Sequence, residues 1–127
     1  LDEDPGLLEA EGERHRERPL HCACGAGSME AACLLLDRGA ATNATDSCGR
    51  TPLMYACNAG RVEIVAMLLQ GGVDPTVPDR AAWTALMWAS FGDEHDGSDH
   101  VAAIRLLLKD GRVPIDARSN SGGTALW

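Results

Sequence analysis

Residues 92–100, GDEHDGSDH, concentrate the residue types that hold metal ions or transfer protons. Their four carboxylates and two imidazoles are Asp93, Glu94, Asp96, Asp99, His95 and His100. Carboxylates suit Ca²⁺ or Mg²⁺, and His beside Asp suits Zn²⁺ or Mn²⁺. The spacing lacks the alternating ligands and distal Glu of an EF-hand loop. Polar segments with Gly and Ser are usually solvated, and Asp99 can cap a following helix, so we predict no metal site here.

A second candidate for metal chemistry is HCAC, residues 21–24. A single CxC pair is a weak zinc signal. The position of Cys24 recurs at equal intervals as Cys57 and Ser90, which is typical of a small residue in a tight helix contact. No GxSxG, phosphate-binding glycine loop or HExxH motif occurs. We therefore predict no catalytic residues, no cofactor and no enzyme activity.

Composition limits the partners that the chain can bind. Its 127 residues, 45% of them hydrophobic, fit one globular domain. The net charge of −8 without a basic stripe argues against nucleic acid and favours a basic protein partner. No apolar run approaches the roughly 20 residues that cross a bilayer, so we predict no membrane partner. Five cysteines, an odd count, do not resemble a disulfide framework and favour the cytosol or nucleus.

The elements that must position these residues follow from an internal repeat. Three stretches align: RPLHCACGAGSMEAACLLLDRG from Arg18, TPLMYACNAGRVEIVAMLLQGG from Thr51 and TALMWAS from Thr84. The two intervals between these starts are equal. Thr51 and Thr84 suit helix N-caps, and Pro19 and Pro52 stand at the first helical position of the first two units. Each unit therefore begins with a helix.

A second helix follows in each unit and ends at a glycine suited to a left-handed cap: Gly39, Gly72 or Gly111. One helix pair cannot bury its apolar face, but stacked pairs can. We predict an all-α solenoid of stacked helix-turn-helix units joined by hairpin-like connectors. The period of about 33 residues and the sequence TPLMYA resemble the ankyrin-repeat family.

Some positions depart from the family pattern. Arg18 replaces the capping Thr, and Ala85 replaces the Pro of the third unit. Ala82 lies where Gly49 lies in the preceding hairpin, which weakens the turn prediction there because Ala rarely adopts the left-handed conformation. Where the family carries a turn-bracing His, the three units have His21, Met54 and Met87.

We assign residues 18–127 to the repeat domain, with units starting near 18, 51 and 84 and a truncated unit near 124. Residues 1–17 are either an acidic leader or the degenerate end of a preceding repeat. The last interval, from Thr84 to Thr124, exceeds the period by seven residues, and six of these lie between Ser90 and Val101. The segment 92–100 is therefore expected to form a loop at a helix-to-helix turn. Both ends resemble cuts, so we expect a fragment of a longer protein.

The resemblance implies a non-catalytic protein-binding scaffold that uses hairpin tips and the concave face of the first helices. The partner-binding candidates by register are Arg50, Asn58, Arg80, Trp83 and Phe91. Trp83 alternatively packs on its neighbouring hairpin, while Tyr55 and Trp88, which share one slot, are expected to be structural. Two other functions stay open: a regulatory or targeting segment of a larger enzyme, with residues 92–100 as a metal or effector site, and an intramolecular scaffold.

Overall fold

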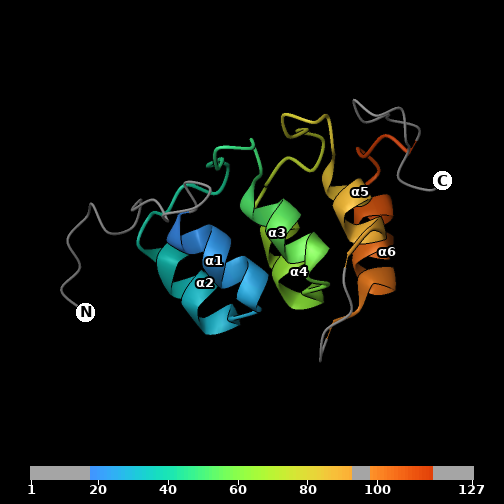
Figure 1. Cartoon of the computed structure of the whole chain (residues 1–127). Helices are drawn as coiled ribbons and strands as arrows, with labels where there is room; N and C mark the ends of the chain where they lie inside the picture. Colours follow the sequence, from blue (N-terminus) through green and yellow to red (C-terminus); the bar gives the residue numbers. More distant parts are fainter. Residues whose placement is uncertain (1–17, 93–97, 116–127) are drawn as a thin grey trace.

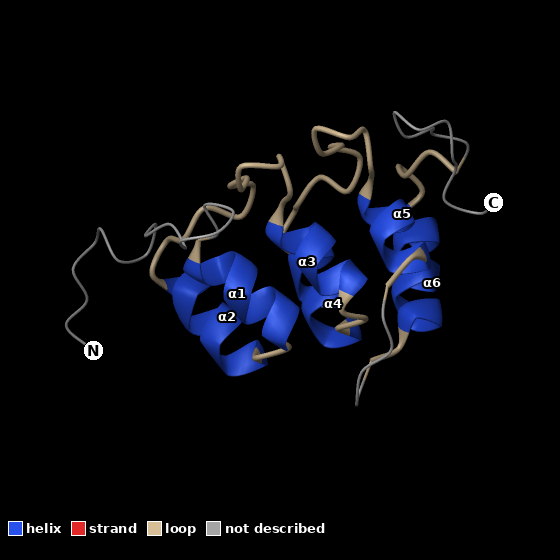
Figure 2. Cartoon of the chain, viewed as in Figure 1, coloured by secondary structure: helices blue, strands red, loops and turns tan. Residues whose placement is uncertain are grey.

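The computed structural model describes residues 18–92 and 98–115, and the helices form three stacked pairs in chain order (Figure 1). These residues contain no strand (Figure 2). The helices are α1 (Pro19–Ala26), α2 (Met29–Asp37), α3 (Pro52–Asn58), α4 (Val62–Gln70), α5 (Ala85–Ser90) and α6 (His100–Asp110). The prediction of an all-α repeat fold is confirmed. The unit near 124 and residues 1–17 lie outside the described residues.

The inner helices α1, α3 and α5 begin directly after the repeat starts predicted from the sequence. The Oγ1 of Thr51 accepts from the backbone N–H of Met54 at 3.3 Å, and Thr84 caps α5 in the same way. At the first unit, the backbone N–H of Arg18 donates to Nδ1 of His21 at 3.0 Å instead. Local hydrogen bonds therefore fix where each inner helix starts.

His21 also braces the first repeat against the second. Because Nδ1 accepts a hydrogen bond from the backbone N–H of Arg18, the ring carries its hydrogen on Nε2, which lies 3.0 Å from the carbonyl oxygens of Ala44 and Arg50. Met54 and Met87 occupy the same position in the next units and are buried without a ring nitrogen to make such bonds. His21 therefore links α1 to the segment between α2 and α3, which contains Ala44 and Arg50.

The core lies between the inner row and the outer row of helices, α2, α4 and α6. Leu20, Leu53 and Leu86, each one repeat period from the next, are about 1% exposed or less. Cys24 and Cys57 are fully buried, as their repeated slot predicted, and burial raises the pKa of the Cys24 thiol to about 12. Such thiols behave as small apolar side chains.

The prediction that Cys24, Cys57 and Ser90 all lie in a tight helix contact is wrong for Ser90. This residue is exposed, and its Oγ donates to the Leu86 carbonyl at 2.8 Å. The slot is buried only where another inner helix covers it, and α5 is the last inner helix among the residues that the structure describes.

The helix register continues across the inserted segment. Leu107 of α6 is fully buried, as is the equivalent Leu68 of α4. The outer helices α4 and α6 also contact the preceding repeat at their starts. The Nε of Arg61 donates to the Gly25 carbonyl at 3.4 Å, and Nε2 of His100 donates to the Asn58 carbonyl at 2.9 Å. The extra residues therefore leave this contact between repeats in place.

Candidate partner-binding surface

The second hairpin, residues 46–50, is organised by one buried carboxylate. Oδ1 of Asp46 accepts the backbone N–H groups of Cys48 and Arg50, both at 2.9 Å. Oδ2 accepts the hydroxyl of Tyr55 at 2.5 Å and lies 3.4 Å from Nε of Arg50. Burial raises the pKa of Asp46, but these hydrogen bonds and the charge of Arg50 outweigh it and hold the pKa below its usual value.

The third hairpin, residues 79–83, repeats this arrangement. Oδ1 of Asp79 accepts the N–H groups of Ala81 at 2.9 Å and Trp83 at 2.8 Å, and Oδ2 accepts the indole N–H of Trp88 at 3.1 Å. Ala82 adopts a left-handed φ of 63°, where the second hairpin has Gly49 at 77°. The turn of the third hairpin is therefore formed, although alanine stands where the second hairpin has glycine.

The two hairpins contact each other and project from the same edge of the helix stack (Figure 1). The backbone N–H of Arg80 donates to the Cys48 carbonyl at 2.9 Å. The guanidinium carbon of Arg50 lies 5.9 Å from the ring centroid of Tyr55 and 5.5 Å from that of Trp88. Two aromatic rings from neighbouring repeats therefore hold one arginine by cation–π contacts.

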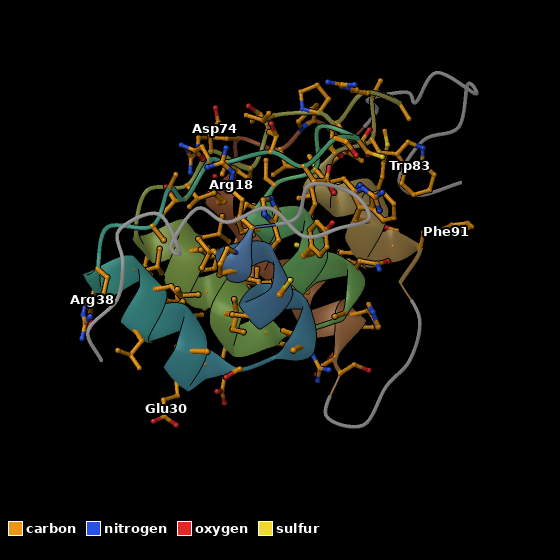
Figure 3. All side chains as sticks on the ribbon, turned by 60° about the vertical axis from the view of Figure 1, so that its left-hand side comes forward. Arg18, Glu30, Arg38, Asp74, Trp83 and Phe91 are labelled. Carbon is orange, nitrogen blue, oxygen red and sulfur yellow. The ribbon has the colours of Figure 1, made fainter. Side chains whose placement is uncertain are left out.

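An aromatic cluster, Trp83, Trp88 and Phe91, extends from the third hairpin to the end of α5. The ring centroids of Trp83 and Trp88 are 4.9 Å apart, and those of Trp83 and Phe91 are 5.3 Å apart in an edge-to-face arrangement. Phe91 is 62% exposed, and Figure 3 shows it beside Trp83 at the surface. Edge-to-face contacts stabilise such a cluster while leaving one ring accessible.

A groove of about 510 Å³ lies between the two hairpins. Its lining residues are Ser47, Cys48, Arg50, Asp79, Arg80, Ala81 and Trp88. A smaller hollow of about 40 Å³ adjoins it on α3, lined by Arg50, Met54, Tyr55, Asn58 and Trp88. Arg50 and Trp88 belong to both, so the two hollows form one continuous surface, here called the hairpin groove.

The five candidate residues lie on or next to this groove. Arg50 and Arg80 line the larger hollow and Asn58 the smaller one, while Trp83 and Phe91 adjoin it through Trp88. Sequence reasoning missed the two aspartates that organise the hairpins. The available signal was an aromatic residue nine positions after an Asp in two successive units.

The ring of Trp83 contacts those of Trp88 and Phe91, and its side chain packs partly against the core. Whether it also packs on the neighbouring hairpin stays open. Tyr55 and Trp88 are structural as expected, because each holds a hairpin aspartate. Cys48, within the second hairpin, is half-buried.

The described ends of segment 92–100 serve the scaffold. Oδ1 of Asp99 accepts the N–H of Ala102 at 2.9 Å and so caps α6, as predicted, while its own N–H donates to the Gly60 carbonyl. His100 is bonded to Asn58 as described above. The other four ionisable residues fall within 93–97, outside the described residues, so a metal or effector role for this segment stays untested.

The HCAC sequence is likewise used for packing. Cys22 is exposed while Cys24 is buried, and both ring nitrogens of His21 bond to the backbone. Within residues 18–92 and 98–115, no three His, Cys, Asp or Glu side chains gather as metal ligands would.

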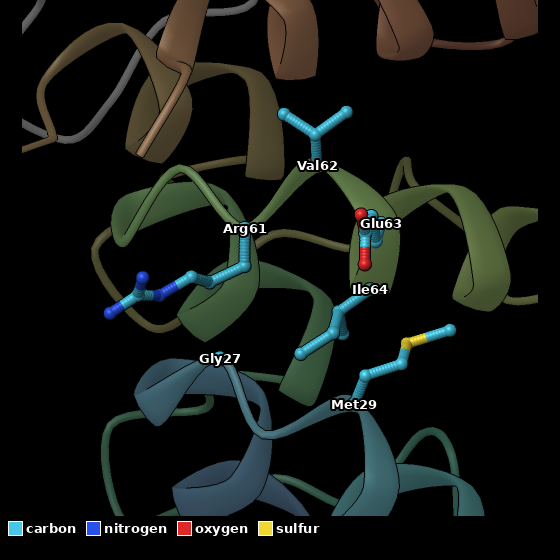
Figure 4. A pocket seen from close by; sticks show the side chains of 6 residues that line it. All are labelled: Gly27, Met29, Arg61, Val62, Glu63 and Ile64. Carbon is cyan, nitrogen blue, oxygen red and sulfur yellow. The ribbon is translucent and has the colours of Figure 1, made fainter. Parts of the chain in front are cut away.

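A third hollow, of about 250 Å³, lies at the other end of the helices (Figure 4). It is lined by the turn at Gly27 and by the start of α4, including Arg61 and Glu63. Arg61 bonds across it to the Gly25 carbonyl, so this hollow is part of the contact between repeats.

The stacked helix pairs and paired hairpins define a repeat protein of the ankyrin class. The family model described as ankyrin repeats (3 copies) matches residues 3–79 and, in an overlapping match, 20–111. The chain therefore belongs to the ankyrin-repeat family, whose members generally mediate protein–protein interactions. No curated protein matches the sequence. Among the described helices, none is long and apolar enough to cross a membrane.

Proposed function

We propose that this chain is a non-catalytic scaffold that binds a protein partner through the hairpin groove and the adjoining aromatic cluster. The residues to which we assign partner contact are Arg50, Asn58, Arg80, Trp83 and Phe91. The observation that carries the proposal is the unbroken set of contacts from Arg50 through Trp88 and Trp83 to Phe91. Arginine and aromatic side chains held in place before binding are typical of residues that dominate binding energy.

Phe91 is the best single probe of this surface. It is 62% exposed and packs edge-to-face against the ring of Trp83, so its substitution should leave the hairpin intact. Trp83 is half-buried, and part of its surface serves packing. A large exposed aromatic beside a groove is the feature that a partner would desolvate.

The overall charge does not by itself describe the partner of this surface. The described residues carry eight Asp and Glu and eight Lys and Arg, so the excess of −8 belongs to the remaining residues. Residues 1–17 alone hold seven carboxylates and two arginines. The prediction of a basic partner therefore applies to those acidic segments, where it stays a prediction.

The five cysteines, all described, are free thiols, which supports the proposed location in a reducing compartment, the cytosol or nucleus.

The proposal is tested with a photo-reactive amino acid at Phe91 of the full chain, and at Leu34 of α2 as control. Leu34 is also exposed but belongs to the outer row of helices. A protein crosslinked from position 91 and not from position 34 is then purified, and its affinity for the F91D and L34D chains is measured by calorimetry. We expect F91D to weaken binding at least about tenfold and L34D to leave it unchanged. Equal affinities would exclude this surface.

A further inference from the structure

We propose that the hairpin groove takes an extended acidic segment of the partner protein, with a carboxylate against Arg50 and a nearby apolar side chain on Trp83 and Phe91. This inference rests on the proposed function, because it names the partner chemistry of the same surface. It differs from the expectation drawn from net charge, which pointed to a basic partner.

Arg50 is held ready for a carboxylate. Tyr55 and Trp88 flank its guanidinium at 5.9 and 5.5 Å, and its side chain is one-quarter exposed. Its Nε lies 3.4 Å from Oδ2 of Asp46, which is too long for a strong charged hydrogen bond. A guanidinium fixed between rings loses little rotamer entropy when it binds an anion.

The carboxylates near the groove lie beneath its surface. The side chain of Asp46, the ion-pair partner of Arg50, is fully buried, whereas that of Arg50 is one-quarter exposed. Both oxygens of Asp46 and both oxygens of Asp79 accept hydrogen bonds from the hairpins and from Tyr55 or Trp88. Asp46 and Asp79 are also only 4% and 8% exposed. A ligand that enters the groove therefore contacts the guanidinium of Arg50 rather than the carboxylate with which it is paired.

A basic side chain fits this groove poorly. Aromatic clusters often bind cations, but Arg50 already lies over the Trp88 ring. A second cation on this ring would approach Arg50 and Arg80 with like charge, which opposes binding.

The contact distances limit the length of the bound segment. Arg50, Trp88, Trp83 and Phe91 are linked by steps of 5.5, 4.9 and 5.3 Å, so the guanidinium and the Phe91 ring are no more than about 16 Å apart. An extended chain covers this span in about five residues. The acidic and the apolar residue of the partner should therefore lie within that separation.

The inference is tested with a labelled synthetic peptide of about twelve residues, in which two glutamates lie within about five residues of a leucine in a serine and glycine background. A matched peptide carries lysines in place of the glutamates. Fluorescence anisotropy measures the affinity of each for the full chain. We expect the acidic peptide to bind at least about tenfold more tightly, with affinity falling as salt is added.

Variants of the chain locate the binding site. We expect R50Q and R80Q each to weaken the acidic peptide several-fold, and R50K, which keeps the charge, to weaken it less than R50Q. R105Q is the matched control, because Arg105 is an exposed arginine of the outer helix α6. Replacing the peptide leucine with serine should weaken binding to wild type but not to F91D. Circular dichroism checks that each variant is folded.

Three outcomes overturn the inference: tighter binding of the lysine peptide, no saturable binding of either peptide, or equal effects of R105Q and R50Q. A large gain in peptide affinity in the E9Q/E11Q/E13Q chain would also overturn it, since the acidic segment 1–17 would then be the occupant. The proposed function fails separately, in the crosslinking comparison of positions 91 and 34.

Discussion

The second and third hairpins reach the same geometry with different residues. In both, an aspartate accepts the N–H groups two and four positions later and then an aromatic donor nine positions later. The second hairpin uses Gly49 and Tyr55 where the third uses Ala82 and Trp88. The shared element is therefore the buried carboxylate, and the glycine is replaceable in at least one copy.

The difference also separates the two hairpins by role. Position 50 places an arginine between two rings, whereas the equivalent position 83 places a tryptophan beside an exposed phenylalanine. One framework thus presents a cation from one repeat and an apolar surface from the next. Both are needed for the ligand that we infer.

The largest effect is expected when the shared carboxylate is removed. D46A and D79A should each lower the free energy of unfolding by about 3 kcal/mol, because two backbone N–H groups and an aromatic donor lose their acceptor. D74A is the control, since the exposed Asp74 accepts only from Thr76 and should lose under about 1 kcal/mol. Urea unfolding followed by circular dichroism measures all three. A small loss in D79A would show that the third hairpin does not depend on its carboxylate.

Gly49 of the second hairpin should not tolerate alanine, even though the third hairpin has Ala82 at the equivalent position. A Cβ at Gly49 would lie 3.0 Å from the Arg80 backbone nitrogen, in addition to the strain of a φ of 77°. G49A is therefore expected to lose about 2 kcal/mol in urea unfolding. If G49A loses no more unfolding free energy than the A82G substitution of the third hairpin gains, the neighbouring hairpin must move to make room for the new Cβ.

Replacing each hairpin aspartate with asparagine should have different effects, because the aromatic partner is Tyr55 in one hairpin and Trp88 in the other. In D79N, the new side-chain NH₂ can face the indole N–H of Trp88, and two donors cannot form a hydrogen bond. In D46N, the Tyr55 hydroxyl can rotate and accept a hydrogen bond from the new NH₂. We expect D79N to lose about 1 kcal/mol more than D46N in the same unfolding measurement. The reverse order would show that the ion pair of Asp46 with Arg50 outweighs the aromatic hydrogen bond.

A82G should stabilise the third hairpin. Ala82 has a φ of 63°, a conformation that glycine adopts without steric strain. The gain is expected to be about 1 kcal/mol, reduced by the greater freedom of glycine in the unfolded chain. The thermal midpoint measures it, with A81G, at the neighbouring exposed position, as the control that should not gain.

Acid should weaken the second hairpin gradually. The pKa of Asp46 is lowered in the fold, so its stabilisation is complete well above the unfolded pKa of about 3.9 and is lost as pH falls through the folded value. The difference in unfolding free energy between wild type and D46N should therefore shrink between pH 7 and pH 3. A constant difference over this range would contradict the lowered pKa.

Much of the fold was predictable because its signals are local. The threonine caps, the left-handed glycines and the spacing of Leu20, Leu53 and Leu86 each depend on residues within one helical turn or one repeat period. Asp99 as a helix cap was predictable for the same reason. The exposure of Ser90 was not, because it depends on which helix covers the slot rather than on the residue.

The candidate site was predictable only in part. Register assigned Arg50, Arg80, Trp83 and Phe91 to one side of the stack, and the structure places all four at or beside the hairpin groove. The contact of Arg50 with Trp88 crosses from one repeat to the next, so it depends on how the repeats stack.

The sequence by itself determined the period, the helix starts and the family, because these follow from short-range hydrogen bonding and from apolar residues recurring at fixed intervals. The tertiary structure decided what the charged and aromatic residues do. It buried Asp46 and Asp79 inside the hairpins, set Arg50 between rings of two repeats and left Phe91 in solvent. These outcomes depend on distances between repeats, which only the stacked helices establish.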